Sequence, residues 1–425
     1  MARPPIDNEV HLEKALLVFV NEDEAEDTYV EDEMVGLCEA AGVEPVGMIR
    51  QRLDRPYKGT YVGTGKVQEI AVMGHEVDAD LILIDGEVTG MQQRNLEEAF
   101  GLRVVDRTQL ILDIFARRAH TKEGMLQVEL AQLTYMMPKL MSVYTKFERQ
   151  KGGIGMRGPG ETKLETDRRM VKQKIARLQE EIEEVKRHRD QQRSSRRKHP
   201  FPFASIVGYT SAGKSTLMNR MAGTQLLADA MPFATLDPTT RKVDLVDGYS
   251  LFLTDTVGFI RHLPTHLVAA FRSTLEEVLY ADFMIHVVDI GHPGWEFQHS
   301  AVIETLEDLG VKDKPTITVL NKMDLLRPED ADRVDAALRL WPNSVGISAT
   351  SGQGMGDLMA AITRQVKELL GSVRALLPYS ESGLLQDCYD FGRVLHTEYR
   401  EDGIFVEAEL VTEMRGKLEK FAIAE

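Results

Sequence analysis

The run GYTSAGKST at residues 208–216 constrains the fold of this 425-residue chain more than any other stretch. An apolar run at 203–207 precedes it, and a helical pattern at 217–221 follows it. A strand, the spacing G-x-x-x-x-G-K-S and then a helix predict a phosphate-binding loop, in which backbone amides surround an anion at a helix N-terminus. Lys214 is expected to reach the outer phosphates of a nucleoside triphosphate, and Ser215 to ligate Mg2+. The predicted contacts are Gly208, Tyr209, Thr210, Ser211, Ala212, Gly213, Lys214, Ser215 and Thr216.

Two switch motifs follow this loop in the order that a Ras-like GTPase domain requires. The first is the run 233–238, ahead of a predicted strand at 242–246, where Thr235 is expected to close on Mg2+ and the γ-phosphate. The second is the run 255–258, where Asp255 would hold Mg2+ through water and the Gly258 amide would touch the γ-phosphate. No catalytic residue is certain; Lys214, Thr235 and Gly258 are the predicted phosphate stabilisers. The predicted switch contacts are Phe233, Ala234, Thr235, Leu236, Asp237, Asp255, Thr256, Val257 and Gly258.

Two later motifs predict the base. The strand at 316–320 runs into Asn321, Lys322, Met323 and Asp324, and the triplet Ser348, Ala349 and Thr350 follows a strand at 344–347. The Asp324 carboxylate can accept two hydrogen bonds from guanine, which adenine does not offer, and the triplet would close over the base. Five motifs in order predict that the chain binds GTP and GDP and hydrolyses GTP with Mg2+ as cofactor.

Residues 1–106 alternate predicted strands and helices, which indicates a small α/β domain with a largely parallel sheet. The run GTYVGTGK at 59–66 superficially resembles a second phosphate loop, but Val67 stands where a metal-binding Ser or Thr is needed. A glycine-rich turn into a helix is the favoured interpretation, and a second nucleotide site is the alternative.

Residues 107–199 show two heptad patterns that predict an antiparallel helical hairpin, with a glycine-rich connection at 151–161 and a linker at 187–198. The net charge of the chain is −16, yet the segment 116–199 carries 21 Lys and Arg against 11 Asp and Glu, so the remainder carries −26. A basic segment with a permissive backbone favours contact with RNA phosphates over a flexible turn with solvated charges. The predicted RNA contacts are Arg149, Lys151, Gly153, Gly155 and Arg157.

The predicted fold is α/β, with domains at 1–106 (α/β), 107–199 (hairpin, loop and linker), 200–372 (Ras-like P-loop GTPase) and 373–425 (small α+β module). The module is expected to have a strand near Ala375, a helix around 383–389, a hairpin of strands at 392–399 and 404–410, and a helix at 414–422. Its sequence indicates no site. Short apolar runs and a charged N-terminus predict a cytoplasmic protein without a membrane span, and the presence of only two cysteines, Cys38 and Cys388, argues against a disulfide framework. The protein is expected to be a monomer.

The chain closely resembles the HflX family of ribosome-associated GTPases over nearly its whole length. The resemblance is carried by the runs 106–108, 111–116, 127–133, 152–161, 233–238 and 255–261. It implies binding to the large ribosomal subunit and its RNA, GTP hydrolysis stimulated by ribosomes, and the splitting of stalled or idle ribosomes under stress. Phe259, typical of the family, stands where many Ras-like proteins carry a water-orienting Gln, so slow intrinsic hydrolysis is expected. Ser211 departs from the Asn that the family and its relatives usually have at that position. In some related GTPases this Asn helps to hold an activating K+, so little stimulation by K+ is expected here.

Two functions of different class agree with these motifs. One is a GTP-hydrolysing factor that splits ribosomes. The other is a nucleotide-gated RNA-binding or ribosome-assembly module that acts by occupancy, with hydrolysis only resetting it.

Overall fold

The computed structural model describes residues 12–21, 27–150, 159–196, 201–223, 231–236, 238–261, 277–341 and 343–423. The chain forms two compact units, with most of the first in residues 1–182 and most of the second in residues 183–425. Each unit has its own sheet and core. The division into four domains stays a prediction.

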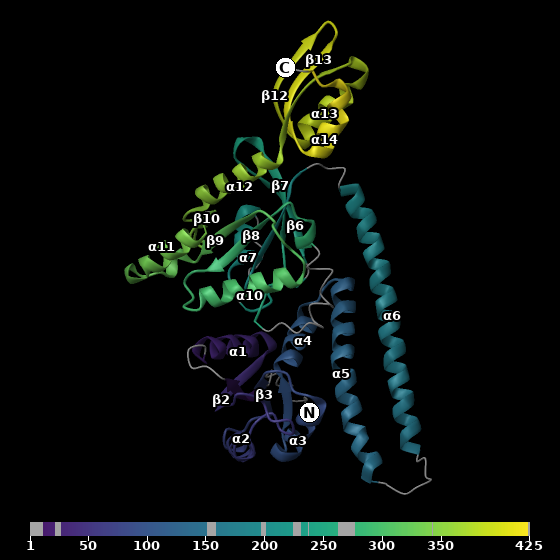
Figure 1. Ribbon diagram of the computed structural model, residues 1–425, viewed down its shortest axis with the longest axis vertical. Coiled ribbons are helices and arrows are strands. Elements are labelled where there is room, and N and C mark those ends of the chain that lie inside the picture. Colours follow the sequence, from purple (N-terminus) through teal and green to yellow (C-terminus); the bar gives the residue numbers. More distant parts are fainter. Residues whose placement is uncertain are drawn as a thin grey trace, which may run out of the picture. The chain divides into compact units, whose positions relative to one another are not determined.

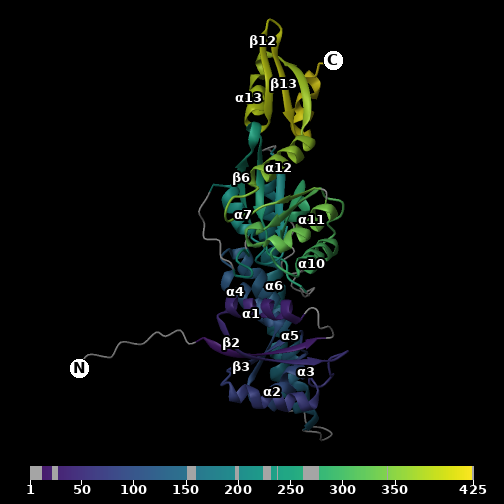
Figure 2. The ribbon, with the colours of Figure 1, turned by 90° about the vertical axis from the view of Figure 1, so that its left-hand side faces the viewer.

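The first unit contains a parallel four-stranded sheet in the order β2-β1-β3-β4. Its core runs through Leu16, Ile82 and Val104, and every residue of β3 is buried, as expected for a sheet that is covered on both faces. Helices α2 and α3 cover one face and α1 and α4 the other (Figures 1 and 2). The elements are β1 (Glu13–Asn21), α1 (Asp27–Ala41), β2 (Val43–Arg52), α2 (Thr64–Glu76), β3 (Leu81–Asp85), α3 (Gly90–Phe100), β4 (Arg103–Asp106) and α4 (Arg107–Arg118).

The run 59–66 forms a turn that leads into α2, which begins at Thr64. The Gly63 amide donates a hydrogen bond to Gln51 Oε1 at 2.9 Å, and a bridge joins Tyr57 to Tyr61. Gln51 thus already satisfies one amide of this turn.

Two long helices, α5 (Lys122–Gln150) and α6 (Pro159–Arg196), form the hairpin region (Figure 1). Leu126 of α5 and Leu178 of α6 line the same groove between the helices, as their heptad positions predict. Two predictions were wrong at the ends of α6. The helix begins at Pro159 rather than after residue 161, because proline is well suited to a first helical turn. It also continues through the predicted linker to Arg196, since Arg and Gln are good helix formers. Residues 151–158 lie outside the described residues.

The second unit is built on a sheet in the order β10-β9-β8-β5-β7-β6, in which β6 alone runs antiparallel to its neighbour. Apolar strands such as β5 and β9 are buried because helices pack on the sheet. Their register brings Gly208, Asp255 and Asn321 to one edge, where parallel strands end and ligands commonly bind. The elements are β5 (Phe203–Gly208), α7 (Lys214–Met221), β6 (Thr239–Asp244), β7 (Ser250–Asp255), β8 (Phe283–Asp289), α10 (Trp295–Asp308), β9 (Thr316–Asn321), α11 (Ala331–Leu340), β10 (Ser344–Gly346) and α12 (Met355–Leu369).

The C-terminal module is an antiparallel sheet in the order β11-β13-β12, made of β11 (Gly371–Leu377), β12 (Arg393–Arg400) and β13 (Gly403–Leu410). Helices α13 (Ser382–Phe391) and α14 (Thr412–Leu418) accompany it, and a short 3-10 turn at Glu419–Phe421 ends the helix that was predicted to reach residue 422. Tyr249, at the turn before β7, joins the module to the GTPase sheet: its hydroxyl donates to Glu409 and accepts from Arg393 Nη1 at 2.8 Å. Among the described residues, no helix is long and apolar enough to cross a membrane.

Candidate functional site

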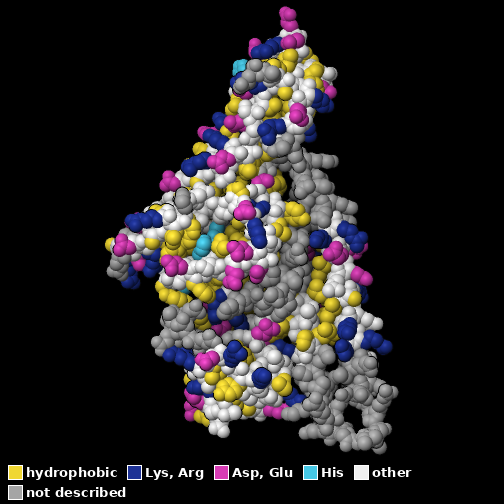
Figure 3. Space-filling view, in the orientation of Figure 1, with side chains coloured by type: hydrophobic (Ala, Val, Ile, Leu, Met, Phe, Trp, Pro, Cys, Tyr) yellow, Lys and Arg dark blue, Asp and Glu magenta, His cyan; other side chains and the backbone are white. Residues whose placement is uncertain are grey.

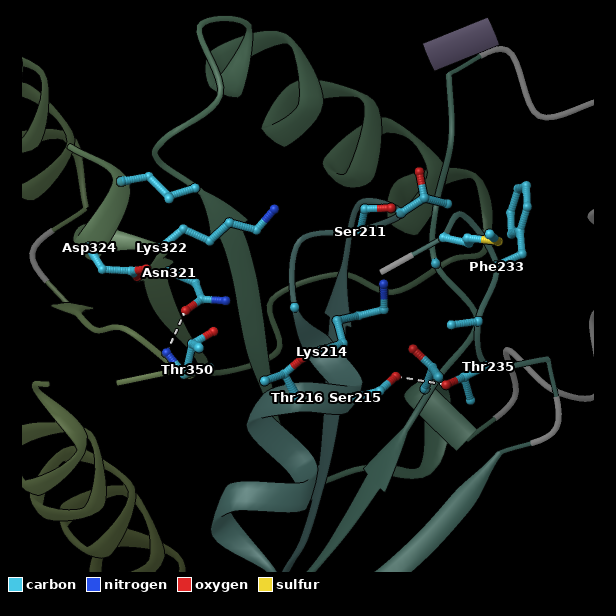
Figure 4. Close-up of a pocket in the computed structure, with 18 residues that line it drawn as sticks. Ser211, Lys214, Ser215, Thr216, Phe233, Thr235, Asn321, Lys322, Asp324 and Thr350 are labelled. Atoms are coloured by element: carbon cyan, nitrogen blue, oxygen red, sulfur yellow. Dashed lines mark hydrogen bonds between the residues drawn. The ribbon is translucent and has the colours of Figure 1, made fainter. Parts of the chain in front are cut away.

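A cavity opens at the edge of the second unit's sheet, where β5, β7 and β9 end. Residues from all five sequence motifs line it, although the motifs span more than a hundred positions of the chain. Figure 4 shows their side chains directed into one hollow above α7. The lining residues are Thr210, Ser211, Gly213, Lys214, Ser215, Thr216, Met231, Phe233, Ala234, Thr235, Thr256, Gly258, Asn321, Lys322, Asp324, Leu325, Ala349 and Thr350.

Two glycines give the phosphate-binding loop its shape. Gly208 has a φ of +155°, and a Cβ there would lie 2.3 Å from the carbonyl oxygen of Val287. Gly213 has a φ of +95°, and a Cβ there would lie 2.3 Å from Nδ2 of Asn321. Each position therefore excludes a side chain on both steric and conformational grounds. The loop therefore wraps tightly just before the N-terminus of α7, the kind of position at which backbone amides bind anions.

Lys214 is the buried cation of the site, with 6% of its surface exposed. Its Nζ donates to the carbonyl oxygens of Gly208 at 3.1 Å and Tyr209 at 2.8 Å. Burial lowers its pKa to about 8, although the nearby Asp255 carboxylate acts in the opposite direction. Binding of an anion beside Lys214 should raise this pKa again, because phosphate oxygens stabilise the charged form of the lysine.

Anion binding at this site is therefore expected to take up a proton above pH 8 and not at pH 7. At pH 7 Lys214 is already charged, whereas at pH 9 it is largely neutral until phosphate raises its pKa. Inorganic sulfate is a suitable stand-in for phosphate because it is fully ionised at both pH values. Calorimetry in two buffers of different ionisation enthalpy counts the protons. Equal proton uptake at pH 7 and pH 9 would contradict the assignment.

The lowered pKa of Lys214 also makes the stability of the folded protein depend on pH. An unfolded lysine titrates near its ordinary value of 10.5, so between pH 8 and 10.5 the unfolded chain binds more protons than the folded chain. The contribution of Lys214 to stability therefore rises as the pH rises through this window.

Oxygen atoms of Ser215, Thr235 and Asp255 converge beside Lys214. Figure 4 shows the first two of these side chains. The hydroxyl oxygens of Ser215 and Thr235 lie 2.8 Å apart, and they donate to Asp255 Oδ2 at 2.7 and 3.0 Å. The other carboxylate oxygen of Asp255 is buried without a hydrogen-bond partner among the described residues, and burial raises the pKa of this group. Mg2+ takes hard oxygen ligands at about 2.0–2.1 Å in octahedral geometry, in which adjacent ligands stand about 2.9 Å apart. The donor set and its spacing fit such an ion.

The base side of the cavity is held together by Asn321. Its Nδ2 donates to Ala212 O at 2.8 Å, and its Oδ1 accepts from the Ala349 amide at 2.9 Å (Figure 4). Asn321 thus connects the phosphate loop to the triplet 348–350. Lys322 lines the cavity and forms an ion pair with Asp289 at 2.7 Å. Asp324 is exposed at the cavity wall, where its carboxylate can meet a base.

Some predicted contacts lie behind the cavity rather than on its wall. Ser348 is completely buried, and its hydroxyl accepts from the Ser351 amide at 3.0 Å. Among the described residues, the predicted contacts that do not line the cavity are Gly208, Tyr209, Ala212, Leu236, Asp255, Val257, Met323 and Ser348. Asp237 lies outside the described residues.

The sequence patterns missed three residues of this site. Met231 and Leu325 line the cavity, and Arg220 donates to the carbonyl oxygens of Ala349 and Thr350. Met231 and Leu325 flank recognised motifs, which was the available signal. Arg220 had none, since its partners lie some 130 positions further along the chain.

Phe259 and Ser211 are the two positions that bear on hydrolysis. The Phe259 ring is 1% exposed, while its backbone exchanges hydrogen bonds with Gly208 and Thr210 of the phosphate loop at 3.1 and 2.7 Å. The residue that directly follows the second switch motif is therefore bonded to the phosphate loop through its backbone, and its side chain is buried. Ser211 lines the cavity with a φ of 59°, a conformation that Asn adopts more readily than Ser.

The sheet order, the glycine-shaped loop and the cavity define a P-loop GTPase domain. Residues 203–322 match the family model described as 50S ribosome-binding GTPase. Residues 29–116 and 118–196 match those described as the N-terminal and middle regions of a GTP-binding GTPase.

Curated relatives named GTPase HflX align over most of the chain. The relative from Caldanaerobacter subterraneus subsp. tengcongensis is 43% identical over 97% of this chain and 94% of its own length. The relative from Lacrimispora saccharolytica is 44% identical over 96% and 95%, and that from Escherichia coli is 42% identical over 92% of each. A crystal structure of SsGBP with GDP shares the fold, at 24% identity and a TM-score of 0.50 over 84% of this chain and 99% of that chain. The chain belongs to the HflX family of GTPases, and the resemblance expected from its motifs is confirmed. It is a GTP hydrolase.

Proposed function

We propose that this GTPase binds the large ribosomal subunit through its helical hairpin and splits stalled or idle ribosomes, with GTP hydrolysis stimulated by the ribosome. The observation that carries the proposal is the presence, in one chain of the HflX family, of a nucleotide cavity and a long basic hairpin. The protein acts as a cytoplasmic monomer in this account.

The cavity holds GTP with its phosphates at Lys214 and its guanine at Asp324. Ser215 and Thr235 would ligate Mg2+, and Asp255 would hold it through water; the ion would neutralise phosphate charge. The Lys214 ammonium and the loop amides orient the phosphate chain, while Gly258 carries the second switch against the γ-phosphate. Phe233, Ala234, Thr256, Asn321, Lys322, Ala349 and Thr350 complete the wall around the nucleotide, and Leu236, Val257, Met323 and Ser348 support it from behind.

The hairpin provides the RNA contact. Arg168, Arg169 and Lys172 are exposed on α6, and Figure 3 shows dark blue Lys and Arg side chains along this helix. The local excess of 10 positive charges in residues 116–199 contrasts with −26 elsewhere, so phosphate-rich RNA is attracted to this segment and repelled by the rest. The proposed loop contacts are Arg149, Lys151, Gly153, Gly155 and Arg157; the side chain of Arg149 and residues 151–158 lie outside the described parts of the structure.

Dependence on a partner is supported by the site itself. Phe259 offers no hydrogen-bonding group, and its ring is buried. The position from which many Ras-like proteins orient the attacking water therefore contributes no polar side chain. We expect the ribosome to supply or organise the missing group.

Purified large subunits are expected to raise GTP turnover of the intact protein at least tenfold. Replacing Arg149, Lys151 and Arg157 with Ala should reduce this stimulation, most visibly at low salt, and leave turnover without subunits unchanged. Each lost phosphate contact should also flatten the log–log salt dependence of binding by about one unit.

The matched control replaces Arg52, Arg55 and Lys58, three exposed basic residues of the first unit, with Ala. This control removes the same charge from outside the hairpin and should keep the stimulation. If both triple variants lose the same share of the stimulation, the effect comes from net charge and not from the hairpin loop. If the hairpin variant keeps the full stimulation, the loop is not part of the ribosome interface. Replacing Gly153 and Gly155 with Ala tests whether the loop backbone contacts RNA, because all charges remain.

A further inference from the structure

Arg220 links two parts of the nucleotide cavity that sequence motifs treat as separate. It lies on α7, the helix whose first turn carries Lys214 and Ser215. Its Nε donates to Ala349 O at 2.5 Å, and its Nη2 donates to Thr350 O. One guanidinium therefore bridges two consecutive carbonyl groups of the base-side loop, a use of the planar fork that a lysine cannot reproduce.

The same loop is shaped to receive the guanidinium. Gly352 has a φ of +92°, and a Cβ there would lie 2.6 Å from Nη1 of Arg220. The loop approaches the arginine so closely at this point that a side chain would collide with it. Gly352 N–H also donates to Ser348 O at 2.8 Å, which closes the loop into a compact turn.

Two side chains thus hold the segment 348–350, one through a backbone amide and the other through backbone carbonyls. Asn321 accepts from the Ala349 amide at 2.9 Å, whereas Arg220 donates to the carbonyls of Ala349 and Thr350. Thr350 and Ser351 are exposed, so water can compete for the hydrogen bonds of this part of the loop. Without Arg220, the two carbonyls would turn to water, and Asn321 would be the remaining side chain described here that ties Ala349 to the rest of the cavity.

We propose that Arg220 is a positioning residue for base recognition, which keeps the loop 348–350 closed over the guanine and so sets the lifetime of the bound nucleotide. The proposal rests on the nucleotide site proposed above. Arg220 acts through the loop and touches neither phosphate nor metal in this account. Its loss should speed release of any guanine nucleotide and leave recognition of the phosphate chain unchanged.

The test measures release of a fluorescent GDP analogue from the full-length protein by stopped flow. Arg220→Ala should release it about tenfold faster, the effect of losing roughly 1.4 kcal/mol of hydrogen bonding to a charged donor. Arg220→Lys should give an intermediate rate, because it keeps the charge but can serve only part of the bridge. Arg339→Ala, which removes an exposed arginine on α11, is the matched control and should behave as the wild type.

Competition by inorganic tripolyphosphate separates this role from simple charge attraction. Its inhibition constant should be the same for the wild type and Arg220→Ala, because the probe has phosphates and no base. A weakened constant, or full restoration of the release rate by Arg220→Lys, would assign the effect to the positive charge and overturn the proposal.

Thermal unfolding of the empty proteins provides the remaining check. Midpoints close to the wild type are expected for both Arg220 variants, since the contacts are at the surface of the loop. If Arg220→Ala does not fold, the Arg220→Lys rate decides: a rate equal to the wild type overturns the proposal. Failure of the wild type itself to bind the GDP analogue would contradict the proposed nucleotide site, an outcome distinct from failure of the Arg220 proposal.

Discussion

Replacing Lys214 with Met should lower GTP turnover at least about a hundredfold, as expected when a preorganised charged group is removed from a phosphate-transfer site. Lys214 is the buried cation among the described residues of the cavity wall, and its Nζ already lies against the loop carbonyls that shape the phosphate cradle. Methionine preserves most of the side-chain volume and removes only the charge and its hydrogen bonds. Turnover at saturating GTP and nucleotide affinity are both measured, with and without large subunits.

The matched control is Lys312→Met, which removes an exposed lysine from the loop before β9 and should leave turnover unchanged. Thermal unfolding of the empty Lys214→Met protein should remain near the wild type. The reason is that lost hydrogen bonds to Gly208 and Tyr209 are offset by the removal of a charge whose burial is unfavourable. Retention of more than a tenth of wild-type turnover in a folded variant would contradict the assignment of Lys214 to the phosphates.

Asp324→Asn should change the preferred base. The exposed carboxylate at the cavity wall accepts hydrogen bonds only, which suits the N1–H and 2-amino group of guanine. An amide offers a donor in place of one acceptor, which suits the 2-carbonyl of xanthine. Sites that hydrogen-bond a base edge discriminate by several orders of magnitude, so we expect at least a hundredfold loss of GTP affinity and a gain for xanthosine triphosphate.

Competition between GTP, xanthosine triphosphate and ATP for the folded variant provides the measurement. Asp332→Asn, which alters a carboxylate in the first turn of α11, serves as the control and should keep the preference for GTP. An Asp324→Asn protein that prefers GTP as strongly as the wild type would contradict the placement of guanine at this end of the cavity. Weak binding of all three nucleotides would indicate that Asp324 supports the loop instead of reading the base.

The fold of the second unit was predictable because its signals are local. A glycine-rich loop between an apolar strand and a helix can be read without knowing any long-range contact, and the order of the motifs then implies the sheet. The class of fold and the family were confirmed for this reason. The parallel sheet of the first unit was likewise visible in the alternation of short apolar runs with helical patterns.

The parts that sequence could not provide depend on tertiary contacts or on the absence of a strong local signal. Arg220 looks like an ordinary helix residue until the fold brings residues 349 and 350 beside it. Asn321 was predicted only as a nucleotide contact, but its side chain joins two loops of the protein. The stretch 187–198 has the composition of a polar linker, yet its Arg and Gln residues continue α6 to Arg196.

Sedimentation shows whether nucleotide binding in this cavity drives the separation of ribosomal subunits. Intact ribosomes are mixed with the protein and a non-hydrolysable GTP analogue and resolved on a sucrose gradient. Free subunits are expected, with the protein on the large subunit, and Lys214→Met should give no separation at the same concentration. Protein bound to ribosomes that remain intact would contradict this proposal and favour a module that acts by occupancy alone.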